Sequence, residues 1–410
     1  MFDDFDSAFF ASNRARLREL FTGTAPIVVT AHGALQRNAD ETYPFHQDAN
    51  FWYLTGINEP DVVLVMDKGK EYLIVPGRGD TRQVFDGSID VTELKRRSGV
   101  ADVLGEKDGW RQLENRLKRV QHVATLSASA SYIEDYGMFS NPARSALITR
   151  LKHMNPNLEF LDVRQHLARM RMIKQPAELV ALQRAIDATI DTLKEVTRPS
   201  QLAKYAYEYE LEADITRGFR RRGATGHAFT PIVAGGERAC TLHNVSNNAA
   251  LASDELVVLD VGAECQGYAA DITRTVSLGG KPSRRQQQVF DAVLAVQEFG
   301  FSILKPGVMP REYEEQIEQF MGEKLRELGL IKSIDHDAVR KYYPHATSHF
   351  LGLDTHDVGD YMRPLEPGIV MTVEPGIYIP EEKIGIRIED DVLITPDGIE
   401  VLTARLPRTL

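Results

Sequence analysis

The sequence predicts an α/β domain at the N-terminus, residues 1–171, followed by an α+β domain, residues 172–410. Three observations support this fold class. A chain of 410 residues is too long for a single hydrophobic core of ordinary size. Short apolar runs bounded by turn residues fill the first part, and strands interrupted by pairs of helices fill the second. Charged residues at 26% and hydrophobic residues at 43% are typical of a globular protein.

In the first domain, apolar runs bounded by Gly, Asp and Lys predict strands over residues 26–30, 62–66 and 72–75. The second domain begins with a helix, because Gln-Pro-Ala-Glu at 175–178 places proline in a first turn, where its missing N–H costs no hydrogen bond. Apolar residues then recur at three- and four-residue spacing and form one stripe: Leu179, Leu182, Ile186, Ile190 and Leu193. We therefore place the domain boundary near residue 172.

A second helical stretch is expected over residues 202–222. Beyond it, β-prone apolar runs are separated by two more helical stretches, at 284–299 and 312–328. The predicted strands cover residues 230–234, 255–261, 271–278, 369–379 and 384–394. This order favours a sheet whose helices pack on one side.

Charge and cysteine content narrow the function classes. The net charge of −11 gives no reason to expect nucleic acid or an anionic membrane surface as a partner. Two cysteines, Cys240 and Cys265, are too few for a secreted disulfide scaffold and favour a reducing compartment. The N-terminal residues lack the pattern of a signal peptide, and no run of about 18 apolar residues occurs. We expect a cytoplasmic protein.

Two acids flank a short glycine-containing turn within residues 256–276, a segment predicted to form a β-hairpin. Partners across a two-residue loop have an odd separation, and 271 − 260 = 11, so Asp260 and Asp271 are expected to face each other. Two facing carboxylates repel each other. The pair therefore requires either a shared proton or a bound cation.

A second pair of acids follows the same rule. Glu374 ends an apolar strand, and Glu389 lies in an alternating strand, on the face opposite its isoleucines. The separation 389 − 374 = 15 is again odd and permits facing carboxylates. Arg387 shares the face of Glu389 and can orient carboxylates or a substrate.

Three of the 11 histidines, His345, His349 and His356, fall within residues 344–359. Four carboxylates and one imidazole fit a site for two metal ions. Oxygen-rich ligation favours Mn²⁺, with Co²⁺, Zn²⁺ and Mg²⁺ as the other candidates. Spacing alone leaves open whether the site exists and which histidine binds.

Four separated blocks of the second domain carry a resemblance to a known family. They read Pro-Ile-Val-Ala-Gly-Gly-Glu-Arg-Ala-Cys-Thr-Leu-His-Asn at 231–244, Asp-Val-Gly-Ala-Glu at 260–264 with Asp-Ile-Thr-Arg-Thr at 271–275, His-Ala-Thr-Ser-His at 345–349 with His-Asp-Val-Gly at 356–359, and Val-Glu-Pro-Gly at 373–376 with Gly-Ile-Arg-Ile-Glu-Asp-Asp at 385–391. The chain resembles the aminopeptidase P and prolidase group of pita-bread metallopeptidases, which cleave Xaa-Pro peptides. Residues 37–56 look like the signature of that group's N-terminal domain.

The resemblance implies a pita-bread (creatinase/aminopeptidase-like) fold for residues 172–410 and a dinuclear site, usually of manganese. Its implied ligands are Asp260, Asp271, His349, Glu374 and Glu389. A hydroxide that bridges the two metals would attack the carbonyl carbon before proline.

Further roles come from the same resemblance. Glu374 would accept the proton, and His243 and His356 would hydrogen-bond the substrate or the tetrahedral intermediate. Arg387 is counted with the catalytic residues and His345 with the substrate-binding ones. We expect an Xaa-Pro aminopeptidase, with an Xaa-Pro dipeptidase (prolidase) and a non-catalytic pita-bread binding module as alternatives.

Two other expectations also follow from the resemblance. The protein should be a homodimer or homotetramer in which Asp40 meets the free α-amino group of a substrate bound by a neighbouring subunit. Phe229 stands where the group's aminopeptidases often carry a tyrosine, and the missing hydroxyl removes a hydrogen bond that can tune a metal ligand.

Overall fold

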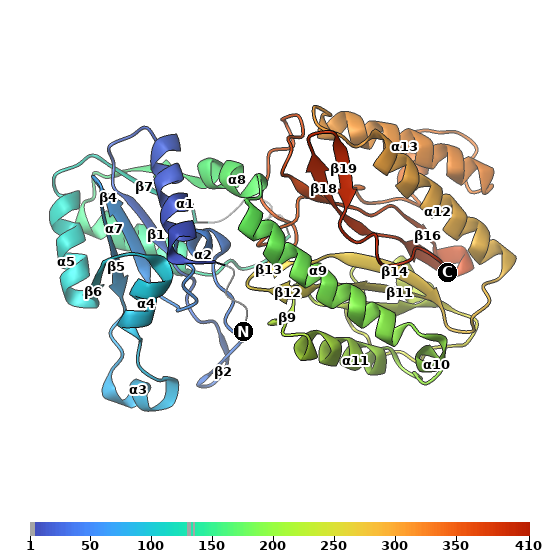
Figure 1. Cartoon of the computed structure of the whole chain (residues 1–410), viewed down its shortest axis with the longest axis horizontal. Helices are drawn as coiled ribbons and strands as arrows, with labels where there is room; N and C mark the ends of the chain where they lie inside the picture. Colours follow the sequence, from blue (N-terminus) through green and yellow to red (C-terminus); the bar gives the residue numbers. More distant parts are fainter. Residues whose placement is uncertain (1–4, 129–132, 134–135) are drawn as a thin grey trace. The chain divides into compact units, whose positions relative to one another are not determined.

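The computed structural model describes residues 5–128, 133 and 136–410. They form two compact units, Phe5–Met170 and Arg171–Leu410 (Figure 1). Among the described helices, none has both the length and the apolar composition needed to cross a membrane.

The first unit is built on a six-stranded sheet in the order β6-β5-β4-β1-β7-β8. The three strands predicted from apolar runs are β1, β4 and β5, and β4 runs antiparallel to both of its neighbours. The strands are β1 (Ile27–Thr30), β4 (Val63–Asp67), β5 (Lys70–Val75), β6 (Asp102–Gly105), β7 (His122–Thr125) and β8 (Glu159–Asp162), with a separate hairpin of β2 (Gln36–Asn38) and β3 (Glu41–Thr42). The helices are α1 (Ser7–Leu20), α2 (Ala49–Thr55), α3 (Asp80–Asp86), α4 (Val91–Ser98), α5 (Glu106–Leu117), α7 (Ala143–Met154) and α8 (Arg164–Met172), whose last two residues belong to the second unit.

The second unit begins with the expected long helix, α9 (Pro176–Val196), which has proline in its first turn and a capping box between Gln175 and Glu178. The prediction of one helix over residues 202–222 is wrong. The chain forms α10 (Pro199–Leu202) and then α11 (Glu208–Arg221). The Glu210 carboxylate accepts hydrogen bonds from the backbone N–H groups of Ala206 and Tyr207, which starts a new helix at this point.

Several short sheets make up the rest of this unit. The orders are β10-β11-β14, β13-β12-β9, β15-β18-β19 and β16-β17. Their strands are β9 (Gly226–His227), β10 (Ile232–Gly235), β11 (Leu256–Val261), β12 (Ala263–Cys265), β13 (Tyr268–Ala269), β14 (Ile272–Ser277), β15 (Val370–Val373), β16 (Gly376–Ile379), β17 (Ile384–Arg387), β18 (Asp390–Thr395) and β19 (Gly398–Val401). The remaining helices are α12 (Arg284–Ile303), α13 (Pro310–Glu327) and α14 (His336–Arg340), and two 3₁₀ turns cover Gly236–Cys240 and Pro380–Glu382.

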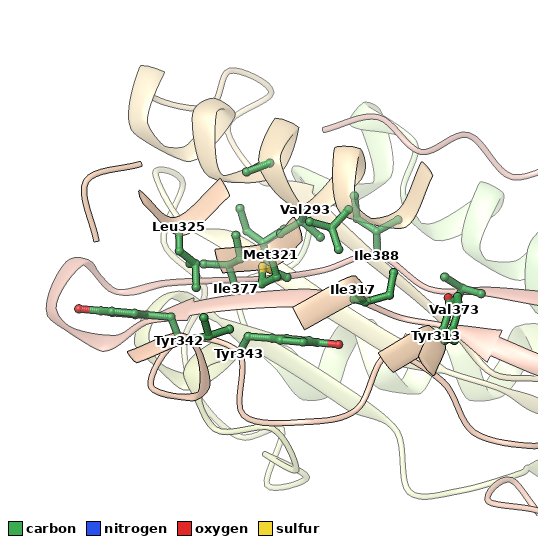
Figure 2. Packing of buried hydrophobic residues seen from close by; sticks show 14 of the residues in the cluster. Val293, Tyr313, Ile317, Met321, Leu325, Tyr342, Tyr343, Val373, Ile377 and Ile388 are labelled. Carbon is green, nitrogen blue, oxygen red and sulfur yellow. The ribbon is translucent and has the colours of Figure 1, made fainter. Parts of the chain in front are cut away.

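Two helix pairs cover these sheets, as the strand–helix order predicted. Val257, Leu259 and Val261 of β11 join the core formed with α9 and α11, which are green in Figure 1. Ile377 and Ile388 pack among residues of α12 and α13 (Figure 2). Because side chains alternate along a strand, the residues between these apolar positions point away from the helices.

Three of the predicted β segments differ in extent. The expected strand over residues 369–379 is divided into β15 and β16 by Glu374 and Pro375, since proline has no N–H to donate to a ladder. The expected strand over residues 384–394 is likewise divided, into β17 and β18, because its two halves pair with β16 and β15 on either side of that break. The segment 256–276 is not a hairpin with a two-residue loop. Residues 262–271 instead leave the ladder and form β12 and β13 of another sheet. A side chain on Gly262 would meet the carbonyl oxygen of Ala270 at 1.7 Å, so the two ends of this excursion can approach closely only with glycine there.

Candidate metal centre

The first pair of acids lies on the face of β11 and β14 that points away from the helices. Asp260 pairs with Thr273 in the ladder rather than with Asp271, so the predicted direct opposition is wrong. Asp271 comes two residues before Thr273 and therefore shares its face. Asp260 and Asp271 are diagonal neighbours on one face because the connection between them is longer than a two-residue turn.

The second pair has the facing register that the odd separation permitted. Val373 pairs with Asp390, and Gly376 pairs with Arg387. The two ladders continue each other in the same register, so Glu374 lies opposite Glu389 in the short gap between them. The backbone N–H of Glu389 donates to Thr273 O at 3.1 Å, which joins this pair to the strand of Asp271.

His349 is held beside the acids by the edge of β15. Its carbonyl oxygen accepts the N–H of Thr372 at 3.0 Å, and its own N–H donates to the Thr372 hydroxyl at 3.2 Å. The ring nitrogen Nδ1 lies 3.0 Å from Phe350 O, so Nδ1 carries the proton and Nε2 presents a lone pair in the neutral ring. Nε2 lies 3.5 Å from Asp271 Oδ2 and 3.4 Å from Glu374 Oε1.

The carboxylate oxygens of the two acid pairs and the Nε2 atom of His349 lie in a buried place with little positive charge nearby. Burial and the neighbouring carboxylates raise the pKa values of Asp271 and Glu389 well above their usual range, and burial raises the pKa of Glu374 to about 7. The Oδ1 atoms of Asp260 and Asp271 are buried and accept no hydrogen bond from any residue that the structure describes.

Asp271, His349 and Glu389 each offer a ligand atom, and these three atoms lie within 4.8 Å of one another. Oxygen atoms of buried carboxylates and one imidazole nitrogen form a donor set that suits divalent Mn, Co or Zn. A bound cation would also give the buried carboxylate oxygens the positively charged partner that they lack. The residues of the site therefore fit a metal centre.

Arg387 orients one of the acids. Its Nη2 donates to Asp260 Oδ2 at 2.6 Å, its Nη1 donates to the Tyr378 hydroxyl at 2.8 Å, and its Nε donates to the Thr273 hydroxyl at 3.2 Å. The Thr273 hydroxyl in turn donates to Glu389 Oε2 at 2.6 Å. One guanidinium thus connects an acid of the first pair to an acid of the second.

His345 is engaged on both sides of its ring. Nδ1 donates to Ala346 O at 2.8 Å, so Nε2 accepts from the Tyr378 hydroxyl at 2.8 Å. Burial, with the Arg387 charge as a smaller cause, lowers the pKa of His345 to about 3, which keeps the ring neutral. Both ring nitrogens are thus engaged in this structure, and the substrate contact expected of His345 stays a prediction. His345 also holds the Tyr378 hydroxyl in place.

His243 and His356 lie at the same site without hydrogen bonds from their rings to any residue in the described part of the chain. The ring centroid of His356 is 4.2 Å from that of His349. Burial, with the charges of His349 and His243 as further causes, lowers the pKa of His356 to about 4. His243 is exposed, and its charge also reaches His345. Both rings keep their nitrogens available for a ligand.

Asp40 belongs to the first unit, where it occupies the exposed turn between β2 and β3. Sequence reasoning missed Thr273 and Tyr378, which connect the carboxylates, the guanidinium and His345. The alternation of side chains in a strand could have indicated both residues, because side chains two or four residues apart share one face. Thr273 follows Asp271 by two residues, and Tyr378 follows Glu374 by four.

Comparison with known proteins is consistent with this geometry. Residues 180–396 match the model of metallopeptidase family M24, and residues 10–124 match the N-terminal domain of aminopeptidase P. The chain belongs to metallopeptidase family M24. M24 membership makes it a metal-dependent peptide hydrolase, and it confirms the predicted fold class of an α/β N-terminal domain followed by a pita-bread catalytic domain.

Relatives of this M24 protein match over nearly the whole chain. The Xaa-Pro aminopeptidase of Haemophilus influenzae is 33% identical over 98% of this chain and 95% of its own, and that of Escherichia coli is 34% identical over 97% and 94%. Among solved structures, zinc-substituted Escherichia coli aminopeptidase P in complex with product has a TM-score of 0.87 at 31% identity, covering 99% of this chain and 97% of its own. Proline aminopeptidase P II from Yersinia pestis has a TM-score of 0.86 at 32% identity, covering 99% and 98%.

Proposed function

We propose that the protein is an Xaa-Pro aminopeptidase, which removes the N-terminal residue from peptides whose second residue is proline. The observation that carries this proposal is that the side chains of two carboxylate pairs and His349 come together in a chain related along its whole length to Xaa-Pro aminopeptidases. The test is hydrolysis of a panel that runs from Xaa-Pro dipeptides to longer Xaa-Pro peptides.

We infer that two divalent ions, Mn²⁺ by preference, are held by these residues: Asp260, Asp271, His349, Glu374 and Glu389. When bound, such ions supply an ionisable water near neutral pH and an electrophile for the carbonyl oxygen. The unpaired buried carboxylate oxygens and the Nε2 lone pair of His349 support this assignment.

The other side chains have distinct roles in the proposed reaction. Glu374, whose Oε1 lies 3.4 Å from His349 Nε2, accepts the proton lost by the nucleophile. Arg387 orients the Asp260 carboxylate through the hydrogen bond from its Nη2. His243 and His356 keep ring nitrogens free and hydrogen-bond the peptide carbonyl as negative charge develops on its oxygen. The neutral state of His356 follows from its lowered pKa, and a neutral ring can donate one hydrogen bond.

The principal alternative is an Xaa-Pro dipeptidase. A dipeptidase must bind the carboxylate directly after proline with a cation that also blocks longer chains. Arg387 is engaged with Asp260, Tyr378 and Thr273, so it is a poor candidate for that cation. We therefore expect Xaa-Pro-Yaa and longer peptides to be cleaved faster than Xaa-Pro. A kcat/KM higher for Xaa-Pro than for every longer peptide tested would identify a prolidase.

We also propose the domain limits 1–171 and 172–410, supported by the division of the described residues into compact units at residue 171. We propose a cytoplasmic homodimer or homotetramer that binds peptides rather than nucleic acid or membranes, in which Asp40 contacts the substrate α-amino group. Both cysteines are free thiols, as expected of a protein in a reducing compartment. Light scattering at micromolar concentration tests the assembly, and a fully active monomer would refute the role of Asp40.

A further inference from the structure

A group of buried charges lies next to the segment that carries His356. Asp357, the next residue, has a side chain only 1% exposed and contacts two cations. Arg171 Nη2 donates to its Oδ1 at 2.5 Å, and Lys174 Nζ donates to its Oδ2 at 3.1 Å. The side chains of Arg171 and Lys174 are 2% and 1% exposed. None of these three residues belongs to the proposed metal site.

The group is balanced in charge. Glu178 of α9 is also buried, and it accepts hydrogen bonds from the Tyr268 hydroxyl and the Gln175 N–H, both at 2.9 Å. Burial alone would raise the pKa of Asp357, yet that pKa is lowered because Arg171 and Lys174 stabilise its charge. Buried ion pairs of this kind add little to stability compared with apolar residues of the same volume. In some proteins such pairs fix one conformation rather than add stability.

The conformation that they fix is the turn from residue 350 to residue 357. The Asp357 N–H donates to Phe350 O at 2.8 Å and closes this turn. A side chain on Gly352 would lie 2.1 Å from Asp357 Oδ2, so the backbone of the turn packs directly against the clamped carboxylate. Arg171 Nη2 also donates to Asp354 Oδ2 at 2.7 Å. The Asp357 carboxylate therefore connects the backbone of the turn to Arg171 and Lys174.

His356 has no comparable support of its own. Its ring makes no hydrogen bond to a residue that the structure describes, and its ring contact is with His349, at 4.2 Å between centroids. The direction of its side chain therefore depends on the backbone that Asp357 anchors. A displacement of about 1 Å at a catalytic group can cost about 10²-fold in rate.

We propose that Asp357, clamped by Arg171 and Lys174, is a positioning residue that aims His356 at the substrate. The proposal rests on the role given above to His356 as a substrate-contacting group. It assigns to Asp357 no contact with substrate or metal, and all of its effect on turnover passes through His356.

A double-mutant cycle tests whether the effect of Asp357 on turnover passes through His356. Asp357→Asn preserves the size of the side chain and should lower kcat/KM for an Xaa-Pro-Yaa peptide by about 10-fold or more, as is typical of residues that orient a ligand or catalytic group. In a His356→Ala background the same substitution should change kcat/KM less than about twofold. An equal loss in both backgrounds, or no loss in the first, would overturn the proposal.

Controls separate positioning from general damage. Asp354→Asn removes the other, half-exposed partner of Arg171 and should leave kcat/KM within about twofold of the wild type. Metal content should be equal in all variants. If Asp357→Asn does not fold, Arg171→Lys, which keeps the charge but loses the planar fork, enters the same cycle with the same criterion.

Crystal structures give a readout independent of activity. In Asp357→Asn the His356 ring should move away from His349, while Asp271 and Glu389 keep their positions. An unmoved His356 ring would refute the positioning role even if the wild type cleaved Xaa-Pro peptides. A wild type that cleaves none of them would refute the proposed function, and the position of the ring would still decide this proposal.

Discussion

Replacing Thr273 by Val removes a single hydroxyl group from the connection between the two pairs of acids. Thr273 is fully buried, and its hydroxyl donates to Glu389 Oε2 at 2.6 Å while accepting from Arg387 Nε at 3.2 Å. Valine has nearly the same shape, so packing is preserved. The backbone bond from the Glu389 N–H to Thr273 O is also preserved. The substitution therefore tests how this hydroxyl orients the Glu389 carboxylate and the Arg387 guanidinium.

The expected magnitude follows from the kind of bond that is lost. A hydrogen bond to a charged group contributes about 1.5–3 kcal/mol, and about 1.4 kcal/mol corresponds to a tenfold change in a binding constant. Residues that orient metal ligands typically change metal affinity by about 10–100-fold. Both routes predict that Thr273→Val weakens Mn²⁺ binding by about 10–100-fold.

Titration of the metal-free protein with Mn²⁺ in a calorimeter measures this effect. Thr275→Val is the matched control, because Thr275 lies on the same face and is equally buried, but its hydroxyl bonds only the backbone of Arg387, at 2.9 and 3.2 Å. The control should lose some stability but keep its Mn²⁺ affinity within about threefold of the wild type. A Thr273→Val protein that binds Mn²⁺ as tightly as the control would refute the reasoning.

Three further outcomes are expected. EDTA should abolish peptide hydrolysis and Mn²⁺ should restore it, and Asp271→Ala should lose turnover together with at least one ion; normal activity in that variant would exclude the assigned site. His243→Ala and His356→Ala should retain metal but lose kcat by about 10²-fold or more, whereas loss of metal, measured by elemental analysis, would place them among the ligands. Burial raises the pKa of Glu374 from 4.5 to about 7 in the metal-free protein, so the stability that its protonated form provides is lost as the pH rises between these values. Glu374→Gln should therefore stabilise the metal-free protein more at pH 8 than at pH 5 in urea unfolding, and a gain independent of pH would contradict this.

Much of the fold and of the site could be predicted because local patterns determine them. The first-turn proline and apolar stripe of α9, and the alternation around Arg387, are dictated by sequence neighbours. The odd separation of Glu374 and Glu389 permitted the facing register that the structure has. The odd separation failed for Asp260 and Asp271, because residues 262–271 pair with another sheet, and that choice depends on tertiary contacts.

Long-range contacts were beyond such reasoning. The hydrogen bond at Nε2 of His345 depends on Tyr378, which is 33 residues away in the chain. The clamp on Asp357 depends on Arg171 and Lys174, 186 and 183 residues away. Charged residues at the start of the second unit have no periodicity that would indicate a partner near residue 357.

The alternation of side chains along the strands determines where the chain can accept inserted residues. On Ile384–Arg387 the isoleucines fill the core with α12 and α13, and the residues between them face the acids. Inserting one residue inside this strand would turn an isoleucine towards the acids and a guanidinium into the core, destroying stability and activity together. Two inserted residues would preserve both faces, and insertions at Gln266–Gly267, in the turn between β12 and β13, would leave both unchanged. Variation in length should therefore be tolerated in the turns, and within the strands only in steps of two.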